Sequence, residues 1–228
     1  MKKLVVLTGA GISAESGLKT FRDSDGLWEG HDVTEVATPE AWSRNPELVQ
    51  QFYNERRRQA QTVKPNAAHE ILAEFEDHFK VTVITQNVDN LHERAGSSHV
   101  VHLHGQLFQS RSSIDEGLIY EMDHWELKMG DLCEKGSQLR PNIVWFGEAV
   151  PMMEPAINIT MQADIFLVVG TSLQVYPAAS LVQYTQTSCP IYLVDPKKPG
   201  GHFGRDMNYI EAKATDGMRQ LKEILLKK

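Results

Sequence analysis

The segment that decides the fold reads LVVLTGAGISAESG and spans residues 4–17. An apolar run leads directly into Gly9-Ala10-Gly11, and Ala14 completes the pattern G-x-G-x-x-G/A. A strand followed by such a turn and a helix binds a nucleotide pyrophosphate, because glycine lets the backbone approach the phosphates and the helix N-terminus attracts negative charge. The motif alone is a weak signal. Its place directly after a strand favours the nucleotide interpretation.

A dehydrogenase of this class needs a second strand that ends in Asp or Glu about 20 residues after the glycine turn, to bind the adenosine ribose. No such strand is visible, because residues 18–28 read LKTFRDSDGLW, which is polar and rich in turn-forming residues. The next clear strand candidate is VTVIT at residues 81–85. Nucleotide binding therefore stands as the prediction, while hydride transfer loses support.

Short apolar segments alternate with helix-like segments along most of the chain. The strand candidates are rich in Val, Ile and Leu and span 4–8, 81–85, 99–103, 142–146, 165–169 and 190–194. The helix candidates span 39–61, 66–78, 88–95, 155–163, 177–186 and 215–227. This alternation predicts an α/β fold with a Rossmann-like parallel sheet that has helices on both faces.

Two segments depart from this alternation and predict a smaller inserted domain, helical or irregular in structure. Residues 24–78 form a helical insert, in which Thr38 and Asn45 precede Pro39 and Pro46 as expected helix caps. Residues 106–139 are polar and irregular. The Rossmann-like domain is then predicted to comprise residues 1–23, 79–105 and 140–228.

The composition indicates an acidic globular protein. The 228 residues are 41% hydrophobic, and the formal net charge of −7 argues against nonspecific nucleic-acid binding. The apolar run at residues 4–7 is shorter than the roughly 7–15 residues of a signal-peptide core, and no segment approaches the roughly 20 apolar residues of a membrane span. Two distant cysteines, Cys133 and Cys189, are typical of a reducing cytoplasm. We expect a cytoplasmic protein without membrane or nucleic-acid partners; the oligomeric state stays open, and a monomer is compatible with the sequence.

Four further polar clusters lie at or after strand ends, where open α/β sheets have their sites. They read TQNVDN at 85–90, VHLHG at 101–105, RPNIVWFGE at 140–148 and VVGTSLQVYPA at 168–178. With GAGISAESG at 9–17 and TFR at 20–22, they make the chain resemble the sirtuins, a family of NAD-dependent protein lysine deacylases. The resemblance covers nearly the whole predicted Rossmann-like domain. It implies NAD as co-substrate and acyl-lysine proteins or peptides as substrates.

The resemblance also implies which residues bind NAD. Gly9, Ala10 and Gly11 would line the pyrophosphate, Gln86 and Asn87 would hold the nicotinamide ribose, and Asp89 would bind the carboxamide. Phe21 and Arg22 lie on the expected cofactor-binding loop. Phosphate, ribose and neighbouring contacts are expected from Ser13, Glu15, Thr20, Trp28, Gly170, Thr171 and Ser172. Asp195 and Ala214 are candidates for adenosine contacts by position alone.

His104 is the predicted general base, and Asn87 is the second predicted catalytic residue. In the reaction that the resemblance implies, the acyl oxygen attacks C1′ of the nicotinamide ribose and nicotinamide leaves. His104 then takes a proton from the ribose hydroxyls, so that the 2′-oxygen attacks the acyl carbon and O-acyl-ADP-ribose and free lysine result. Histidine suits this step because its pKa lies near the operating pH. His102, two residues earlier, is expected to be structural.

Two segments are expected to lie along an extended substrate peptide and bind its main chain. The first contains Val144, Phe146, Gly147 and Glu148, and the second contains Val175. The alternative interpretation for Val144 and Phe146 is a core strand, and we expect both interpretations to be partly true.

Tyr53 and Arg56 indicate the acyl group. They are three residues apart in a predicted helix and therefore share a face. A guanidinium and a phenol can together bind a carboxylate, and this Tyr-x-x-Arg pair resembles the mark of sirtuins that remove succinyl or malonyl groups. The alternative is a solvated basic helix face, which we assign to Arg57 and Arg58.

The chain departs from the resemblance where most sirtuins bind zinc through four cysteines. Residues 106–139 contain only Cys133, and His124 with Cys133 cannot form the tetrad that a structural zinc site needs. We therefore expect no zinc or other metal. Apolar contacts are expected to hold this segment instead, from Leu118, Ile119, Tyr120, Met122, Trp125 and Leu127.

Two other functions remain open from the sequence. One is a protein mono-ADP-ribosyltransferase that uses the same site, although such a transfer needs no carboxylate anchor like the Tyr53–Arg56 pair. The other is a non-catalytic NAD or ADP-ribose sensor, against which the set of Asn87, Asp89 and His104 argues.

Overall fold

The structure is a computed structural model that describes residues 1–19, 27, 28, 30–200 and 204–227. Its centre is a six-stranded sheet in the order β11-β10-β9-β1-β4-β5, with all pairings parallel. The strands are β1 (Lys3–Thr8), β4 (Lys80–Thr85), β5 (Val100–His102), β9 (Ile165–Val169), β10 (Ile191–Asp195) and β11 (Asn208–Glu211). The predicted Rossmann-like sheet is confirmed, and β11 is a strand that the sequence analysis missed.

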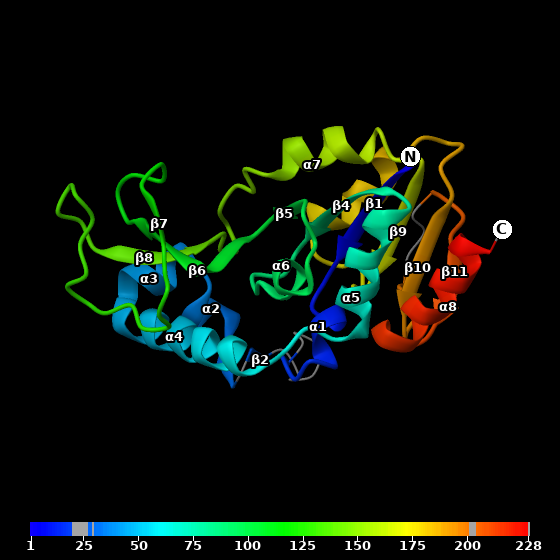
Figure 1. The fold of residues 1–228 in the computed structure, drawn as a ribbon. Coiled ribbons are helices and arrows are strands. Elements are labelled where there is room, and N and C mark those ends of the chain that lie inside the picture. The colour runs from blue at the N-terminus through cyan, green and yellow to red at the C-terminus, as the bar shows by residue number, and fades with distance from the viewer. Residues whose placement is uncertain (20–26, 29, 201–203, 228) are drawn as a thin grey trace.

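Helices cover both faces of this sheet because its strands are apolar on both sides. On β1, Leu4 and Val6 point to one face and pack in the core between the sheet and α1 (Gly11–Ala14), α5 (Ala67–Glu74) and α8 (Ala214–Leu226). Val5 and Leu7 point to the other face and pack in the core between the sheet and α7 (Met153–Thr160) with the 3₁₀ helix η2 (Ala178–Tyr184). The 3₁₀ turn η1 (Phe75–Asp77) continues α5, and α6 (Leu91–Ala95) packs beside it. The layers are visible in Figure 1, where α5 and α8 lie side by side.

A second, smaller sheet lies at the other end of the molecule (Figure 1). It is antiparallel in the order β7-β6-β8, with β6 (Gly105–Ser112), β7 (Ile119–Glu121) and β8 (Leu139–Ile143). Three helices pack with it around a third core: α2 (Val33–Val36), α3 (Pro39–Arg44) and α4 (Pro46–Thr62). A two-stranded ribbon, β2 (Leu27–Trp28) with β3 (His31–Asp32), precedes them. We call α2–α4 and β6–β8 the small lobe.

The small lobe corrects two predictions about secondary structure. Residues 106–139 are not simply irregular, because β6 and β7 lie within them. The predicted strand 142–146 belongs to the small sheet and ends at Ile143. Buried positions of β6 and β8 include the polar residues Ser110, Arg111 and Arg140, so these strands lack the continuous apolar runs that marked the large sheet. The predicted domain boundaries stay a prediction.

The predicted helix 39–61 is two helices that meet at Asn45. Asn45 ends α3 and caps α4, where its Oδ1 accepts a hydrogen bond from the Leu48 N–H at 3.1 Å. Thr38 caps α3 by accepting from the Ala41 N–H at 3.0 Å. Both caps were predicted, and each proline occupies a first-turn position where its missing N–H costs nothing.

Arg57 is fully buried, so its predicted solvated position is wrong. Its guanidinium donates to the Trp125 carbonyl at 2.7 Å, the Leu107 carbonyl at 3.2 Å and Asn54 Oδ1 at 2.5 Å. Arg57 thereby ties α4 to β6 and to the segment after β7. Arg58 is exposed, as predicted, with its guanidinium 5.8 Å from the Trp125 ring centre.

Polar contacts, more than the predicted apolar ones, join the end of the small lobe. Ser112 Oγ and Cys133 Sγ contact Ser137 Oγ at 2.8 and 3.1 Å, and Lys135 Nζ binds Asp115 Oδ2 at 2.6 Å. Of the six expected apolar residues, Met122 and Leu127 are buried and Ile119 is 48% exposed. Among the described residues no group of three or more His, Cys, Asp or Glu could hold a metal ion. The absence of zinc stays a prediction.

Candidate functional site

The carboxyl ends of the parallel strands meet at one edge of the large sheet, and this edge brings most predicted site residues together. The turn after β1 lies against the turn after β9. The Gly9 N–H donates to the Val169 carbonyl at 3.1 Å, and the Gly11 N–H donates to the Gly170 carbonyl at 2.8 Å. Thr171 is buried beside this contact, whereas Ala10 and Ser172 are partly exposed.

These two turns need glycine because their backbones touch. A Cβ on Gly11 would lie 2.7 Å from Gly170 Cα, and a Cβ on Gly170 would lie 2.3 Å from the Ile12 nitrogen. Gly170 also has φ +64°, a conformation that side chains disfavour. A Cβ on Gly9 would lie 2.7 Å from Thr171 Cβ. The floor of the site is therefore bare backbone, as close phosphate binding requires.

A polar network continues from this floor to β4. Asn87 Nδ2 donates to the Gly9 carbonyl and to Ser13 Oγ, both at 3.2 Å. Ser13 Oγ then donates to Asp89 Oδ2 at 3.1 Å. Gln86 Nε2 donates to Thr171 Oγ1 at 3.1 Å and so joins the turn after β9. These predicted residues, distant in sequence, form one connected group.

Asp89 is buried at the centre of this network. Burial raises the pKa of its carboxyl group. Hydrogen bonds from the Leu91 N–H at 3.1 Å and from Ser13 lower the pKa, but by less than burial raises it. A carboxylate in this position is costly to bury unless polar groups contact it. An ionised Asp89 can accept a hydrogen bond from a ligand, and its predicted contact with the carboxamide stays a prediction.

His104 follows β5 at the junction between the two sheets. Its Nδ1 lies 3.0 Å from the Gln86 carbonyl oxygen. A carbonyl only accepts, so Nδ1 carries the proton and Nε2 carries the free electron pair of the neutral ring. Burial lowers the pKa of His104 below its usual 6.5, with the Gln86 carbonyl opposing it. Near neutral pH the ring is therefore an available base.

Gly105 sets the direction in which His104 leaves the strand. It has φ +80°, and a Cβ there would lie 2.0 Å from the Asn142 carbonyl oxygen. No other residue fits this turn without moving β8 away from His104.

His102 has the structural position that was predicted for it. Its Nδ1 contacts the Asn87 carbonyl at 3.1 Å, and its Nε2 contacts Glu93 Oε1 at 2.7 Å. Burial alone would lower the pKa of His102, but the hydrogen bond and charge of Glu93 outweigh it and raise the pKa. Both ring nitrogens are engaged in positioning Asn87 and α6, so His102 is not available as a base.

Two buried histidines in this region were missed by the sequence analysis. His69 Nε2 lies 3.5 Å from Ser13 Oγ, and the His69 ring packs against the His92 ring with centroids 4.9 Å apart. His92 Nε2 lies 3.0 Å from Thr8 Oγ1. Burial lowers the pKa of His69 to about 4, and that of His92 also falls well below 6.5. The sequence held one indication that His69 is buried: it precedes Leu72 by three residues and so shares the apolar face of α5.

The outer cofactor candidates have other partners. Glu15 accepts hydrogen bonds from the N–H and hydroxyl of Thr215, both at 2.9 Å, at the N-terminus of α8. Asp195 is buried at the end of β10, where its Oδ1 accepts from the Lys197 N–H at 2.9 Å. Ala214 is the first residue of α8. Their predicted contacts with the cofactor stay predictions. Thr20, Phe21, Arg22 and the side chain of Trp28 lie outside the described residues.

The predicted peptide-binding segments differ from one another in exposure. The Val144 N–H donates to the His104 carbonyl at 2.9 Å, which places this segment beside the predicted base. Phe146 is 47% exposed and lies outside β8, so it is not a core strand residue. Gly147 and Tyr176 are exposed, and Val175 is half buried.

Glu148 points into the protein instead of along a peptide. Its carboxylate accepts from Arg140 at 2.8 and 3.2 Å, from Arg111 at 3.1 Å and from the Trp145 N–H at 2.8 Å. Burial would raise the pKa of Glu148, but these partners outweigh it and lower the pKa. Direct contact of this carboxylate with substrate stays an untested prediction; its visible contacts stabilise the 140–148 segment.

Tyr53 and Arg56 lie on α4, the helix of the small lobe that carries Arg57. Tyr53 is fully buried, and its hydroxyl oxygen accepts a hydrogen bond from Trp145 Nε1 at 3.1 Å. Burial raises the pKa of Tyr53 well above its usual value, with the Arg56 charge opposing it. Arg56 is partly exposed, and its guanidinium lies 5.7 Å from the Phe52 ring centre.

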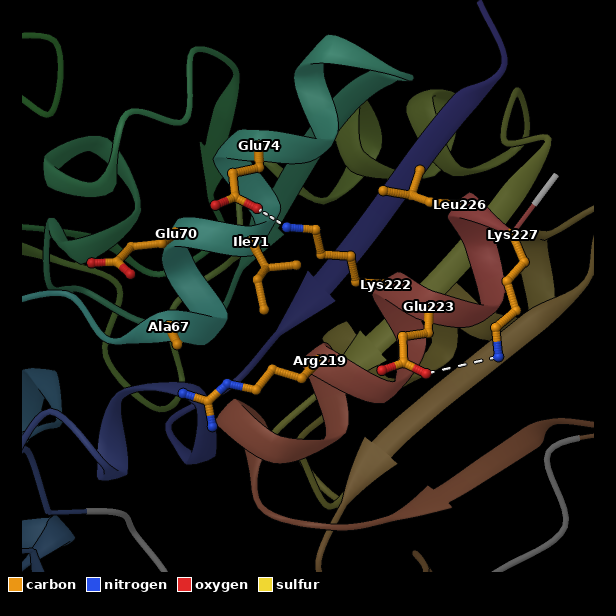
Figure 2. A pocket seen from close by; sticks show the side chains of 9 residues that line it. All are labelled: Ala67, Glu70, Ile71, Glu74, Arg219, Lys222, Glu223, Leu226 and Lys227. Carbon is orange, nitrogen blue, oxygen red and sulfur yellow. Dashed lines mark hydrogen bonds and ion pairs between the residues drawn. The ribbon is translucent and has the colours of Figure 1, made fainter.

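One surface groove beside the large sheet lies away from these residues. It has a volume of about 640 Å³ and runs between α5 and α8, where Lys222 pairs with Glu74. Figure 2 shows its lining of charged side chains around Ile71 and Leu226. None of the predicted site residues that the structure describes lines it.

The Sir2 family profile matches residues 9–177. The chain belongs to the Sir2 family. The match includes the glycine turn, the network around Asn87, and His104, and it ends just beyond Val175. The family predicted by resemblance is therefore confirmed.

Relatives of similar length carry a consistent description. An NAD-dependent protein deacylase of Helicobacter pylori is 55% identical over 97% of this chain and 96% of its own length. One of Bacteroides thetaiotaomicron is 54% identical over 99% of both chains.

Solved Sir2 structures share the fold. A mutant Sir2 homologue in complex with ADP-ribose has a TM-score of 0.88 and 40% identity, covering 100% of this chain and 95% of that one. A complex of a Sir2 homologue with NAD has a TM-score of 0.85 and 40% identity, covering 98% and 91%. A Sir2 mutant with a p53 peptide and NAD has a TM-score of 0.80 and 31% identity, covering 97% and 92%.

Proposed function

We propose that this Sir2-family chain removes acyl groups from protein lysine in an NAD-dependent reaction, and that it acts on succinyl and malonyl groups as well as on acetyl. The products are nicotinamide, free lysine and O-acyl-ADP-ribose. NAD-dependent protein deacylation follows from the family and from relatives that are 54–55% identical over nearly the whole chain. The observation that carries the choice of acyl group is the pairing of Tyr53 with Arg56 on α4.

The residues at the sheet edge fit NAD. The bare backbone around Gly9, Gly11 and Gly170 suits a pyrophosphate, and the buried Asp89 suits a carboxamide. NAD supplies an activated ribose whose nicotinamide can leave. Asn87 and Gln86 lie between these two ends, and their side-chain amides can bind ribose hydroxyls. This assignment of individual contacts is part of the proposal.

His104 is the group that removes a proton from the ribose hydroxyls. Its Nδ1 is committed to the Gln86 carbonyl, which leaves Nε2 for the proton transfer. The lowered pKa keeps the ring neutral at working pH. The same contact places the base beside Gln86 and Asn87, the residues proposed to hold those hydroxyls.

Tyr53 and Arg56 bind the carboxylate of an acidic acyl group. The guanidinium offers two parallel hydrogen bonds and the phenol a third. The raised pKa of Tyr53 keeps its hydroxyl protonated. An acetyl group has no carboxylate, so it makes no use of this pair.

The test compares matched acetyl-lysine and succinyl-lysine peptides by mass spectrometry, with and without NAD. We expect NAD-dependent loss of succinyl that is faster than loss of acetyl. Arg56→Met should lower kcat/KM for the succinyl peptide by roughly 30- to 150-fold through KM, the cost of a lost charged hydrogen bond, with little effect on acetyl. Arg58→Met is the matched control, because Arg58 is an exposed arginine on the same helix.

Three outcomes would change the proposal. Loss of acetyl alone would remove the acidic specificity and leave a deacetylase. Equal effects of Arg56→Met on both peptides would remove the anchor role of Arg56. If neither acyl group were lost, ADP-ribosyl transfer to protein or a non-catalytic sensor would replace deacylation.

A further inference from the structure

Trp145 is buried immediately after β8 and contacts the residue that is proposed to bind the acyl carboxylate. Its Nε1–H donates to the Tyr53 hydroxyl oxygen at 3.1 Å, across 92 positions of sequence. An indole nitrogen can only donate. The Tyr53 oxygen is therefore the acceptor in this bond, and the Tyr53 proton points away from the indole.

Trp145 has little freedom to change this arrangement. Its backbone N–H donates to Glu148 Oε2 at 2.8 Å, and the Arg140 guanidinium lies 3.2 Å from the indole ring centre. Arg140 is itself bound to Glu148 at 2.8 Å and to the Ile143 carbonyl at 2.9 Å. The Trp42 ring packs beside the indole, with centroids 5.9 Å apart. Rotation of the indole would break its contacts with Arg140 and Trp42 together with the hydrogen bond to Tyr53.

We propose that Trp145 is a positioning residue for acidic acyl groups, because its indole N–H orients the Tyr53 hydroxyl to donate toward the carboxylate that Arg56 binds. This inference rests on the proposed function of the Tyr53–Arg56 pair. A phenol hydroxyl has one proton and two electron pairs, and it rotates freely without a fixed partner. With the indole occupying one electron pair, the proton is restricted to directions away from the indole. Pre-orientation of this kind lowers the entropy lost when the substrate is bound.

The inference separates Trp145 from a residue that only fills space. Trp145→Phe keeps an aromatic ring against Arg140 and Trp42 but has no N–H to donate. We expect kcat/KM for succinyl-lysine to fall about fivefold, the effect of one neutral hydrogen bond, mainly through KM. The value for acetyl-lysine should stay within about twofold, since no carboxylate needs the oriented hydroxyl.

A double-mutant cycle with Tyr53→Phe tests whether Trp145 acts through Tyr53. In the Tyr53→Phe background the hydroxyl is absent, so Trp145→Phe should have no further effect on the succinyl-to-acetyl ratio. Trp42→Phe is the matched control, because the same substitution is made beside the same indole. Thermal unfolding of each variant shows which of them keep the wild-type fold. The ratio of kcat/KM for the succinyl and acetyl peptides, taken within one variant, does not depend on how much of the enzyme is folded.

Several results would overturn the inference. These are equal losses for both substrates in Trp145→Phe, an unchanged succinyl reaction, or the same loss in the presence and absence of the Tyr53 hydroxyl. A wild-type chain that removes only acetyl would overturn both this inference and the acidic specificity. A wild-type chain that prefers succinyl and loses it in Arg56→Met but not in Trp145→Phe would overturn the role of Trp145 alone.

Discussion

The nucleotide edge of the large sheet and the small lobe hold their functional residues by different means. At the sheet edge, backbone contacts dominate: Gly11 and Gly170 touch through a hydrogen bond of 2.8 Å, and parallel strand ends carry the surrounding side chains. In the small lobe, buried cations supply contacts between segments: Arg57 on α4 donates to the Trp125 and Leu107 carbonyls, and Arg140 on β8 binds Glu148. One region needs the absence of side chains, and the other needs particular charged side chains.

This difference predicts that the two regions fail for opposite reasons. An added methyl group disrupts a backbone contact, whereas a removed charge leaves several buried acceptors without a donor. The lobe also carries the proposed acyl anchor on α4, so its loss should affect the choice of acyl group as well as stability.

The largest effect should follow Gly11→Ala at the sheet edge. The new Cβ would lie 2.7 Å from both Gly170 Cα and its carbonyl oxygen, so the two turns must separate. A displacement near 1 Å costs about a hundredfold in rate, and we expect NAD-dependent deacylation to fall by at least that much for every acyl peptide. Gly200→Ala is the control, because no atom of the described residues lies within 4 Å of its added Cβ. Near wild-type activity in Gly11→Ala would show that the contact of the turns is not needed.

Arg57→Met should give the next largest effect, on stability. Methionine replaces the buried stem, but the Trp125 and Leu107 carbonyls lose their donor. Unsatisfied buried acceptors of this kind should lower the free energy of unfolding by about 2–4 kcal/mol in urea titration. Arg58 is the next residue in the chain and is exposed, so Arg58→Met should change the free energy of unfolding by less than about 1 kcal/mol. Equal effects of the two variants would contradict the structural role of Arg57.

The smallest expected effect concerns His104, which lies at the junction of the two regions, and it should be visible in the pH profile of kcat/KM. Because burial lowers the pKa of His104, its ring is neutral above that pKa and becomes inactive when it gains a proton below it. The acid limb should therefore have an apparent pKa below 6.5, with about a tenfold loss per pH unit beneath it. A limb above 6.5 would contradict the assignment of His104 as the base. The limb should disappear from the residual activity of His104→Gln.

Much of the nucleotide edge could be predicted from sequence because its signals are local. The apolar runs of β1, β4 and β9 each lead into their own polar cluster, and parallel strands bring those ends to one edge. Where the apolar pattern was weaker, the prediction was less complete. The strand β11 was missed, and the helix predicted at 177–186 is the 3₁₀ helix η2. In the small sheet, β6 and β7 were not predicted, because β6 is largely polar and β7 has only three residues, and β8 was predicted only in part, over 142–146.

The remaining features depend on partners that are distant in the chain. Within a run of three arginines, only the packing of α4 against Trp125 and Leu107 distinguishes the buried Arg57 from the exposed Arg58. The contact between Trp145 and Tyr53 spans 92 positions, and that between Glu15 and Thr215 spans 200. Local sequence determines which segments become helices and strands, because this depends on nearby residues and on apolar periodicity. Which polar side chains become buried partners is decided only when the folded elements meet, because burial and hydrogen-bond geometry exist only in the tertiary structure.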